Sequence, residues 1–222
     1  MTISRRNDLP LLYVLKTPSG RPESEEMPLV IVMHGRGADS NDLADVAPLL
    51  DGPSGYRFVF PNAPKPWEAA PGMTFGFSWF DGWPPSAPSL EASREVMFRF
   101  LEEVTKLYPT PEGKIVIAGF SQGALMALDV GLRTTKPIAG IVAMSGGIYE
   151  ENLPDLSAKK NLPVLIVHGT ADEVIPLPAA RRARQVLERH GLHPEYEEFP
   201  MGHHVTEDSM AVVARFFQRC LE

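Results

Sequence analysis

The pentapeptide Gly-Phe-Ser-Gln-Gly at residues 119–123 constrains this chain more than any other feature, because it directly follows the apolar run Lys114–Ala118. A strand that ends in Gly-x-Ser-x-Gly and passes into a helix makes a turn so sharp that only small residues fit beside the serine. The next residues, Ala124–Leu128, are good helix formers. The pattern predicts a nucleophile elbow with Ser121 Oγ exposed at the carboxyl edge of a sheet. The alternative is a Gly-Ser turn without chemistry.

Length and composition predict one globular domain over residues 1–222. The chain has 222 residues, of which 44% are hydrophobic and 22% charged, as is usual for a soluble domain with a sizeable core. A net charge of −7 argues against nucleic acid and against an anionic membrane surface as partners. These features leave the oligomeric state open, and a homodimer is compatible with them.

The single cysteine and the first residues indicate the cytoplasm. Cys220 has no partner for an internal disulfide, and no histidine lies close to it in sequence. The start of the chain lacks the apolar stretch of a signal peptide, and no segment approaches 18 apolar residues. We therefore expect a cytoplasmic protein without stable membrane association.

Apolar runs of strand length alternate with helical patterns, which predicts a mostly parallel central sheet with helices on both faces. We expect about seven strands, at Leu11–Lys16, Leu29–Met33, Arg57–Phe60, Lys114–Ala118, Ile138–Met144, Pro163–Val167 and Glu195–Phe199. We expect helices at Ser40–Leu50, Leu90–Leu107, Ala124–Leu132, Pro178–His190 and Thr206–Leu221, the last with Thr206 as N-cap.

The segment Pro61–Pro88 interrupts this alternation. It is rich in proline and aromatic residues, and a connection of this length without secondary structure is usually functional. Its aromatics could simply pack the loop onto the body. The functional reading is that Met73, Phe75, Trp79 and Trp83, together with Val174 from a later loop, contact an acyl or aryl group beside Ser121. The connection Ser145–Leu162 is too short for a large cap domain.

Two further strand ends carry the partners that a nucleophilic serine requires. A serine attacks only when a base takes its proton, and an acid must orient that base. Asp172 follows the strand Pro163–Val167, and His203 follows the strand Glu195–Phe199. The order serine, acid, histidine is that of an α/β-hydrolase fold, so we expect Ser121, Asp172 and His203 to meet at one sheet edge.

Neighbouring residues leave two alternatives open. His204 adjoins His203, and Glu173 adjoins Asp172; only one member of each pair can fill the role. We favour His203, which directly follows Gly202, and the spacing alone does not decide between the two acids. Alternatively, Asp172 caps a turn and His203 is an ordinary loop histidine. We expect no metal site, because zinc needs further well-spaced ligands, and no cofactor.

The turn after the second expected strand resembles half of an oxyanion hole. A tetrahedral intermediate needs two donors, which this fold takes from the N–H after the nucleophile, here Gln122, and from a loop N–H. The loop His34–Gly37 contains Gly35 and Gly37, which allow it to turn in close to the site. The alternative is a glycine-rich turn into a helix.

Together the motifs HGRGAD (34–39), FPNAP (60–64), SWFD (78–81), GFSQG (119–123), HGTADEVIP (168–176) and PMGHH (200–204) resemble the bacterial carboxylesterase and phospholipase family that includes the acyl-protein thioesterases. The resemblance covers roughly residues 10 to 220. It implies a catalytic triad of Ser121, Asp172 and His203, and oxyanion donors on the backbone of Arg36 and Gln122. Arg36 stands where the thioesterase branch usually has leucine, and Ala124 where many relatives have a second glycine.

These features predict a serine carboxylesterase that hydrolyses short- to medium-chain carboxylic esters of small molecules through an acyl-enzyme. One rival keeps the mechanism but acts on the thioester of an acylated protein, or on a lysophospholipid. A rival of another class is a non-catalytic binding protein on a hydrolase scaffold, which a missing triad residue would favour.

Overall fold

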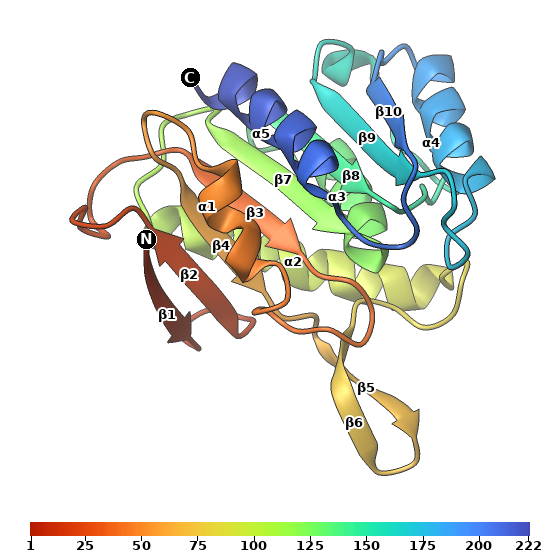
Figure 1. The fold of residues 1–222 in the computed structure, drawn as a ribbon, viewed down its shortest axis with the longest axis horizontal. Coiled ribbons are helices and arrows are strands. Elements are labelled where there is room, and N and C mark those ends of the chain that lie inside the picture. Colours follow the sequence, from red (N-terminus) through yellow and green to blue (C-terminus); the bar gives the residue numbers. More distant parts are fainter.

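The computed structural model describes residues 1–68 and 70–222 and has an α/β-hydrolase fold (Figure 1). An eight-stranded sheet has the order β1-β2-β4-β3-β7-β8-β9-β10. Strands β4, β3, β7, β8, β9 and β10 run parallel to one another, whereas β2 is antiparallel to both of its neighbours, β4 and β1. The strands are β1 (Thr2–Arg6), β2 (Tyr13–Thr17), β3 (Leu29–Met33), β4 (Arg57–Pro61), β7 (Ile115–Phe120), β8 (Gly140–Met144), β9 (Val164–Gly169) and β10 (Glu195–Phe199).

Helices cover both faces of this sheet, as the alternating pattern predicts. On one face α2 (Ala87–Leu107), α3 (Gln122–Arg133) and α4 (Pro178–Arg189) pack with the sheet into one hydrophobic core. On the other face α1 (Ala47–Leu50) and α5 (Glu207–Leu221) enclose a second core (Figure 1). Thr206 caps α5 as expected, because its side chain accepts a hydrogen bond from Ser209 N.

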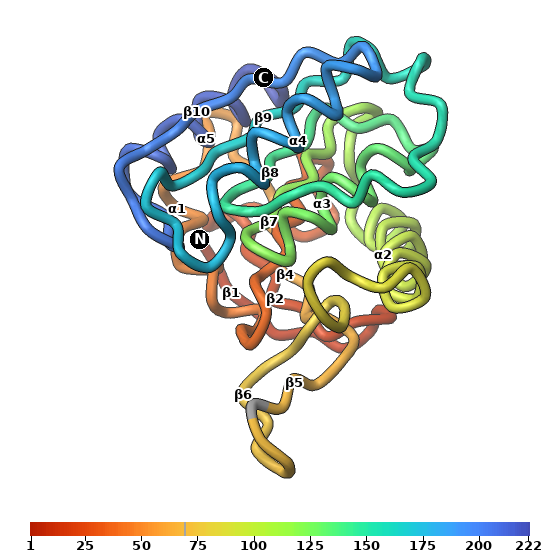
Figure 2. The backbone as a smooth tube through the Cα atoms, turned by 90° about the vertical axis from the view of Figure 1, so that its right-hand side faces the viewer, coloured from red at the N-terminus to blue at the C-terminus, as the bar shows by residue number. Residues whose placement is uncertain are grey.

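Three strands are absent from the sequence-based prediction. The eighth strand, β1, is a polar edge strand paired to β2, and it shows too little apolar alternation to be found by pattern. The segment Pro61–Pro88 contains a two-stranded sheet, β5 (Lys65–Ala70) and β6 (Met73–Ser78). This hairpin projects from the body in both views (Figures 1 and 2). Pro66 and Gly76 lie inside its strands, and such residues argue against a strand in sequence-based prediction.

The expected helix Ser40–Leu50 is shorter than predicted. It consists of the 3-10 turn η1 (Ala44–Val46) followed by α1. Asp39 Oδ1 accepts hydrogen bonds from the backbone and side-chain nitrogens of Asn41, both at 2.7 Å. This turn, in which an aspartate side chain mimics the backbone, competes with the first turn of a helix.

No cap covers the carboxyl edge of the sheet in the described residues. The connection between β8 and β9 contains only the 3-10 turn η2 (Ser157–Lys159). In the described part of the chain, no helix has the length and hydropathy needed to cross a membrane.

Candidate active site

Ser121 occupies the turn between β7 and α3 in a backbone conformation that few residues adopt. Its φ is 57° and its ψ is −117°, which is a strained combination for a residue with a side chain. The flanking glycines have no room for a Cβ. At Gly119 a Cβ would lie 2.1 Å from Gly123 O, and at Gly123 it would lie 2.1 Å from Met33 O. The small residues of the pentapeptide are therefore required by the packing of the turn.

Ser121, His203 and Asp172 form a continuous chain of hydrogen bonds. Ser121 Oγ lies 2.9 Å from His203 Nε2, and His203 Nδ1 lies 2.7 Å from Asp172 Oδ2. Because the carboxylate can only accept, Nδ1 carries the proton and Nε2 is free to accept from the hydroxyl. Phe120 packs against the imidazole with 4.9 Å between ring centroids. This arrangement can transfer a proton from the hydroxyl to the imidazole.

Asp172 is buried but well supplied with donors. Its Oδ1 accepts from the backbone nitrogens of Val174 at 2.9 Å and Ile175 at 2.8 Å. Burial raises the pKa of this carboxyl, but the hydrogen bonds from His203, Ile175 and Val174 outweigh that effect and leave the pKa below its ordinary value. Asp172 is therefore a carboxylate at neutral pH, as an orienting acid must be.

The loops that carry Asp172 and His203 pack tightly against each other. Ala171 N donates to Met201 O at 3.1 Å, and Thr170 N donates to Phe199 O at 2.8 Å. A Cβ at Gly169 would lie only 2.3 Å from Met201 O. This close approach fixes the distance between the acid and the histidine.

The neighbouring alternatives, His204 and Glu173, lie elsewhere. Both side chains are exposed to solvent. Among the described residues, no hydrogen bond joins either side chain to Ser121, His203 or Asp172. The structure therefore places beside Ser121 the histidine that the sequence favoured, His203, and the acid that the family resemblance implied, Asp172.

The loop after β3 approaches Ser121 from the other side. A Cβ at Gly35 would lie 3.3 Å from Ser121 Cβ. Neither Arg36 N nor Gln122 N donates to another group among the described residues, and both residues line the pocket beside Ser121. Both N–H groups are thus available to an oxyanion, and Gln122 N is also at the N-terminus of α3, where the helix dipole favours negative charge.

The buried His34 supports this loop. Its Nε2 accepts from Ala63 N at 3.0 Å, so its Nδ1 carries the proton and donates to Gly35 O at 2.6 Å. Burial lowers the pKa of His34 to about 4, which keeps the ring neutral. This role of His34 was not predicted, although the residue belongs to the HGRGAD motif.

The base of the β5–β6 hairpin holds the same loop. Gly37 N donates to Phe77 O, and Phe77 N donates to Ala38 O, both at 2.9 Å. A Cβ at Gly76 would lie 2.3 Å from Gly37 O, so the two backbones are in direct contact. The hairpin is therefore an anchor for the loop that contains Arg36.

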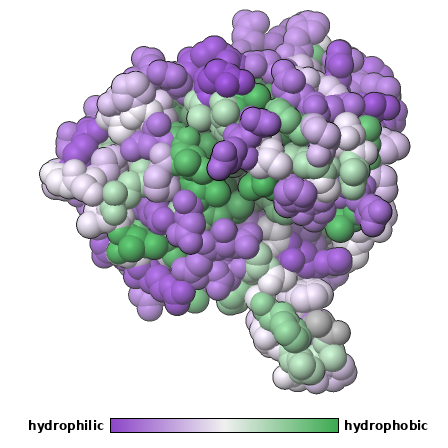
Figure 3. Space-filling view, in the orientation of Figure 1, coloured by the Kyte–Doolittle hydropathy of each residue, from purple (hydrophilic) through white to green (hydrophobic). Residues whose placement is uncertain are grey.

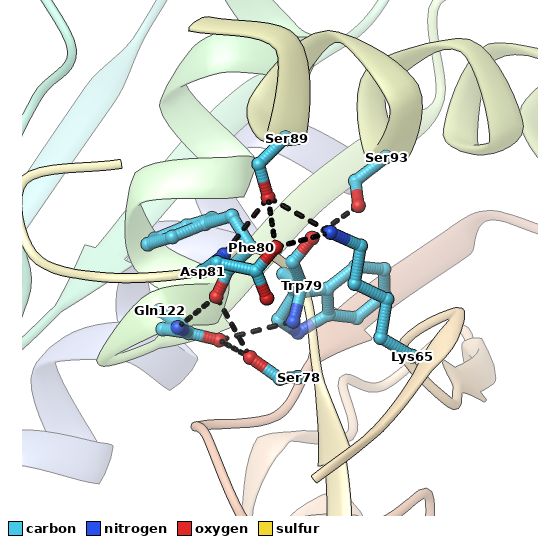
Figure 4. Close-up of polar contacts among 8 residues, drawn as sticks. All are labelled: Lys65, Ser78, Trp79, Phe80, Asp81, Ser89, Ser93 and Gln122. Atoms are coloured by element: carbon cyan, nitrogen blue, oxygen red, sulfur yellow. Dashed lines mark hydrogen bonds and ion pairs between the residues drawn. The ribbon is translucent and has the colours of Figure 1, made fainter. Parts of the chain in front are cut away.

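The Gln122 side chain connects the elbow to the segment after β6 (Figure 4). Its Oε1 accepts from Trp79 N at 3.0 Å and from Ser78 Oγ at 3.1 Å, and its Nε2 donates to Phe80 O at 2.9 Å. Ser93 Oγ on α2 donates to Trp79 O. This network fixes the segment that leads to Trp83.

A pocket of about 110 Å³ adjoins Ser121. Two of the residues predicted to contact substrate, Trp83 and Val174, line it and are 41% and 59% exposed. The complete lining is Arg36, Gly82, Trp83, Ser121, Gln122, Val174 and Ile175. Sequence reasoning missed Gly82 and Ile175, which are direct neighbours of Trp83 and Val174.

The other three residues predicted to contact substrate are not at the pocket, which is a correction. Met73 and Phe75 are 54% and 58% exposed on the projecting hairpin, whose apolar surface is visible in Figure 3. Trp79 is fully buried, and its Nε1 donates to His34 O at 2.8 Å. The physical reason is that Pro61–Pro88 was expected to be a loop beside the site. Instead, Met73 and Phe75 belong to a projecting hairpin, and Trp79 is buried in the body of the protein.

Within residues 1–68 and 70–222, no cluster of three or more histidine, cysteine or acidic residues could hold a metal ion.

Comparisons with known proteins identify the family of this chain. A sequence profile of the phospholipase/carboxylesterase family matches residues 20–221. The chain is 31% identical over 217 residues to acyl-protein thioesterase 1 of Candida albicans, covering 87% of this chain and 92% of that protein. It is 27% identical over 211 residues to acyl-protein thioesterase 1 of Debaryomyces hansenii, covering 87% and 91%.

Solved structures share the fold. The crystal structure of esterase PE8 matches with a TM-score of 0.77 and 28% identity, covering 93% of this chain and 99% of that one. A carboxylesterase from Mesorhizobium loti matches with a TM-score of 0.81 over 96% of this chain and 97% of that one. At 22% identity, this match shows a shared fold alone.

Proposed function

Because this chain belongs to the phospholipase/carboxylesterase family, whose members hydrolyse ester bonds, we propose that it is a serine carboxylesterase acting on short- to medium-chain esters. The observation that carries the proposal is the unbroken chain Ser121–His203–Asp172, with contacts of 2.9 Å and 2.7 Å. The contacts lie within the range required of a nucleophile and its base.

In the proposed first half-reaction Ser121 Oγ attacks the ester carbonyl while His203 Nε2 takes its proton. Asp172 holds the imidazole and stabilises its positive form. The carbonyl oxygen becomes an oxyanion that accepts hydrogen bonds from Arg36 N and Gln122 N. The intermediate collapses to the acyl-enzyme, and His203 protonates the leaving alcohol.

In the second half-reaction His203 takes a proton from water as the water attacks the acyl carbonyl. A second oxyanion forms at the same two N–H groups. Collapse of this intermediate releases the carboxylic acid and returns the proton to Ser121. The scheme uses no metal ion and no cofactor.

The pocket supports a preference for short and medium acyl chains. It has a volume of about 110 Å³, and the hairpin that could have covered it projects from the body (Figure 2). Each methylene left in water forgoes about 0.8 kcal/mol of binding. Longer chains therefore gain little once the pocket is filled.

Active-site labelling tests the proposal directly. A fluorophosphonate should label the wild-type protein but not Ser121→Ala, and p-nitrophenyl ester hydrolysis should disappear in the same variant. Wild-type kcat/KM should peak at roughly two to eight acyl carbons, by the same accounting of buried methylenes. Absence of labelling and of hydrolysis would favour a non-catalytic binding protein.

The second candidate is an acyl-protein thioesterase or lysophospholipase that uses the same residues. The names of the two fungal relatives favour it. A kcat/KM peak at palmitoyl esters, or faster cleavage of an S-palmitoylated peptide than of p-nitrophenyl butyrate, would support this candidate over the carboxylesterase.

We also propose that the enzyme acts in the cytoplasm on a small-molecule ester, without nucleic acid or stable membrane association. The net charge of −7 and the single cysteine support this proposal.

A further inference from the structure

Arg36 gives the pocket beside Ser121 a charge that ester hydrolysis does not require. Among the residues that line the pocket, Arg36 is the charged one, and the others are glycine, serine, glutamine, tryptophan, valine and isoleucine. Arg36 is exposed to solvent. The mouth of the pocket therefore presents a cation to an approaching substrate.

The guanidinium has no acidic partner among the described residues. Other arginines pair with carboxylates, such as Arg94 with Asp129 and Arg181 with Glu198, whereas no ion pair of the described chain includes Arg36. Its Cζ instead lies 5.9 Å from the centroid of the Trp67 ring. A guanidinium beside an aromatic ring keeps its N–H donors for another acceptor.

The structure holds Trp67, and with it the guanidinium, beside the mouth of the pocket. Trp67 is on β5, and β6 is joined to the loop of Arg36 by the two 2.9 Å hydrogen bonds between Phe77 and residues 37 and 38. A Cβ at Gly37 would lie 3.0 Å from the Trp67 ring. The ring and the loop are therefore in contact.

Three acidic residues close in sequence to the Arg36 loop or to the pocket lining are engaged with other partners, whereas Glu173, next to Val174, is exposed. Asp39 accepts from Asn41 at 2.7 Å, and Asp81 accepts from Lys65 Nζ at 2.7 Å (Figure 4). Asp172 is buried and bonded to His203. The N-terminus of α3 adds a further positive potential at Gln122.

We propose that Arg36 is a specificity-determining residue and that the preferred substrates are esters with a carboxylate a few bonds from the scissile carbonyl. The proposal rests on the proposed esterase function. The guanidinium binds the carboxylate through charge-assisted hydrogen bonds, while the backbone N–H of the same residue faces the developing oxyanion. One residue thus contributes to both recognition and orientation.

Matched pairs of esters test this proposal. The acyl-side pair is p-nitrophenyl hydrogen adipate and its terminal carboxamide, and the alcohol-side pair is 4-butyryloxybenzoate and 4-butyryloxybenzamide. The measured quantity is the ratio of kcat/KM for the carboxylate to kcat/KM for the amide, at pH 7.5 and low salt with the uncatalysed rate subtracted. The pair with the larger ratio identifies the side on which the carboxylate binds.

In at least one pair, Arg36→Gln should lower the ratio by about ten-fold, the contribution of one charge-assisted hydrogen bond in an open site. Arg36→Lys should retain part of the preference. Arg215→Gln, which removes an exposed arginine from α5, should leave the ratio unchanged. In the wild-type enzyme the ratio should fall as salt is added, because an exposed contact is screened.

Equal ratios for the wild-type enzyme and Arg36→Gln in both pairs would overturn the proposal. The proposal would also be overturned if the carboxylate-to-amide ratio of the wild-type enzyme did not change with salt. This second test needs no variant. If the proposal fails in this way, the esterase function still stands provided that the wild-type enzyme cleaves the ester bonds of the two carboxamide compounds and Ser121→Ala does not. Failure to hydrolyse any of the four esters would count against the esterase function itself.

Discussion

His203 and His204 are adjacent in sequence, but they occupy different environments. His203 lies between Ser121 and Asp172, whereas His204 is exposed. We expect His203→Ala to reduce kcat by about 10⁴, the loss typical of a disrupted triad, and His204→Ala to do far less. Steady-state hydrolysis of p-nitrophenyl butyrate, with circular dichroism to check the fold, measures both. An inactive His204→Ala beside an active His203→Ala would reverse the assignment.

Gln122 has a second role through its side chain, which is buried and 3% exposed. In Gln122→Ala the buried Trp79 N–H loses its acceptor, and an unpaired buried donor costs about 1–3 kcal/mol. We expect the free energy of unfolding in urea to fall by that amount. KM should rise as well, because the segment leading to Trp83 is released.

A matched control separates this effect from simple truncation. Gln185→Ala makes the same change on the exposed surface of α4 and should alter stability by no more than about 0.5 kcal/mol. Equal stability of the two variants would show that the Gln122 network contributes nothing measurable.

At the residue scale, the sequence predicts which residues form the hydrogen-bonded triad better than it predicts which residues line the pocket. Placement after strands was sufficient to select Ser121 and to favour His203, because the carboxyl ends of parallel strands meet at one edge. The choice of Asp172 over Glu173 came from the family resemblance. Spacing could not decide which aromatics face the pocket. Trp79 and Trp83 are four residues apart, yet one is fully buried and the other is 41% exposed in the pocket lining.

At the scale of elements, α2 and α3 are held together by a buried ion-pair cluster. Asp129 on α3 accepts from Arg94 Nε on α2 at 2.6 Å and from Arg133 Nε at 3.0 Å. The side chain of Asp129 is 1% exposed. α3 begins directly after Ser121, so this cluster also fixes the helix that begins with Gln122, the proposed oxyanion donor.

Asp129→Ala should destabilise the protein by about 3–5 kcal/mol, because it leaves two partly buried guanidinium groups without their carboxylate. Alanine is the better helix former, so helix propensity cannot account for a loss. Urea unfolding measures the change, and Glu95→Ala on the exposed face of α2 should stay within about 0.5 kcal/mol. A loss below 1 kcal/mol in Asp129→Ala would contradict the role assigned to the cluster.

The elements that the sequence predicts are those with strong apolar periodicity. Most of the parallel strands are buried runs such as Leu29–Met33 and Val164–Gly169, and a covered strand must be apolar on both faces. The parallel edge strand β10 is the partly exposed exception. β1 contacts the sheet along one edge, and the β5–β6 hairpin contacts the body at its base. Neither was predicted, because elements with so little buried surface lack a strong apolar pattern. Their pairing depends on tertiary contacts, such as the bridge between Ala38 and Phe77, that no local pattern encodes.

At the scale of the whole molecule, the resemblance to the carboxylesterase family is confirmed by the match over residues 20–221. The word bacterial in that description of the family is not confirmed, since both thioesterase relatives named above are fungal. The fold class follows from the alternation of strands and helices. The small pocket and its cation do not follow from it, because they depend on how three separate loops pack.

The stability of the whole domain should depend on pH through the buried His34. Its pKa falls from 6.5 to about 4 on folding because burial penalises the charged form. The unfolded chain therefore binds a proton at a higher pH than the folded chain. The contribution of His34 is complete above pH 6.5 and is lost as the pH falls toward 4. This difference corresponds to about 3 kcal/mol.

Urea unfolding between pH 8 and pH 4 measures this loss, and His34→Gln should remove about 3 kcal/mol of the pH dependence together with part of the support for the Arg36 loop. His193→Gln, which replaces an exposed histidine, should retain the wild-type dependence. Asp172 acts in the same direction at lower pH, because its lowered pKa stabilises the fold until the carboxylate is protonated. An unchanged pH dependence in His34→Gln would mean that the buried imidazole is not the group whose protonation opposes folding.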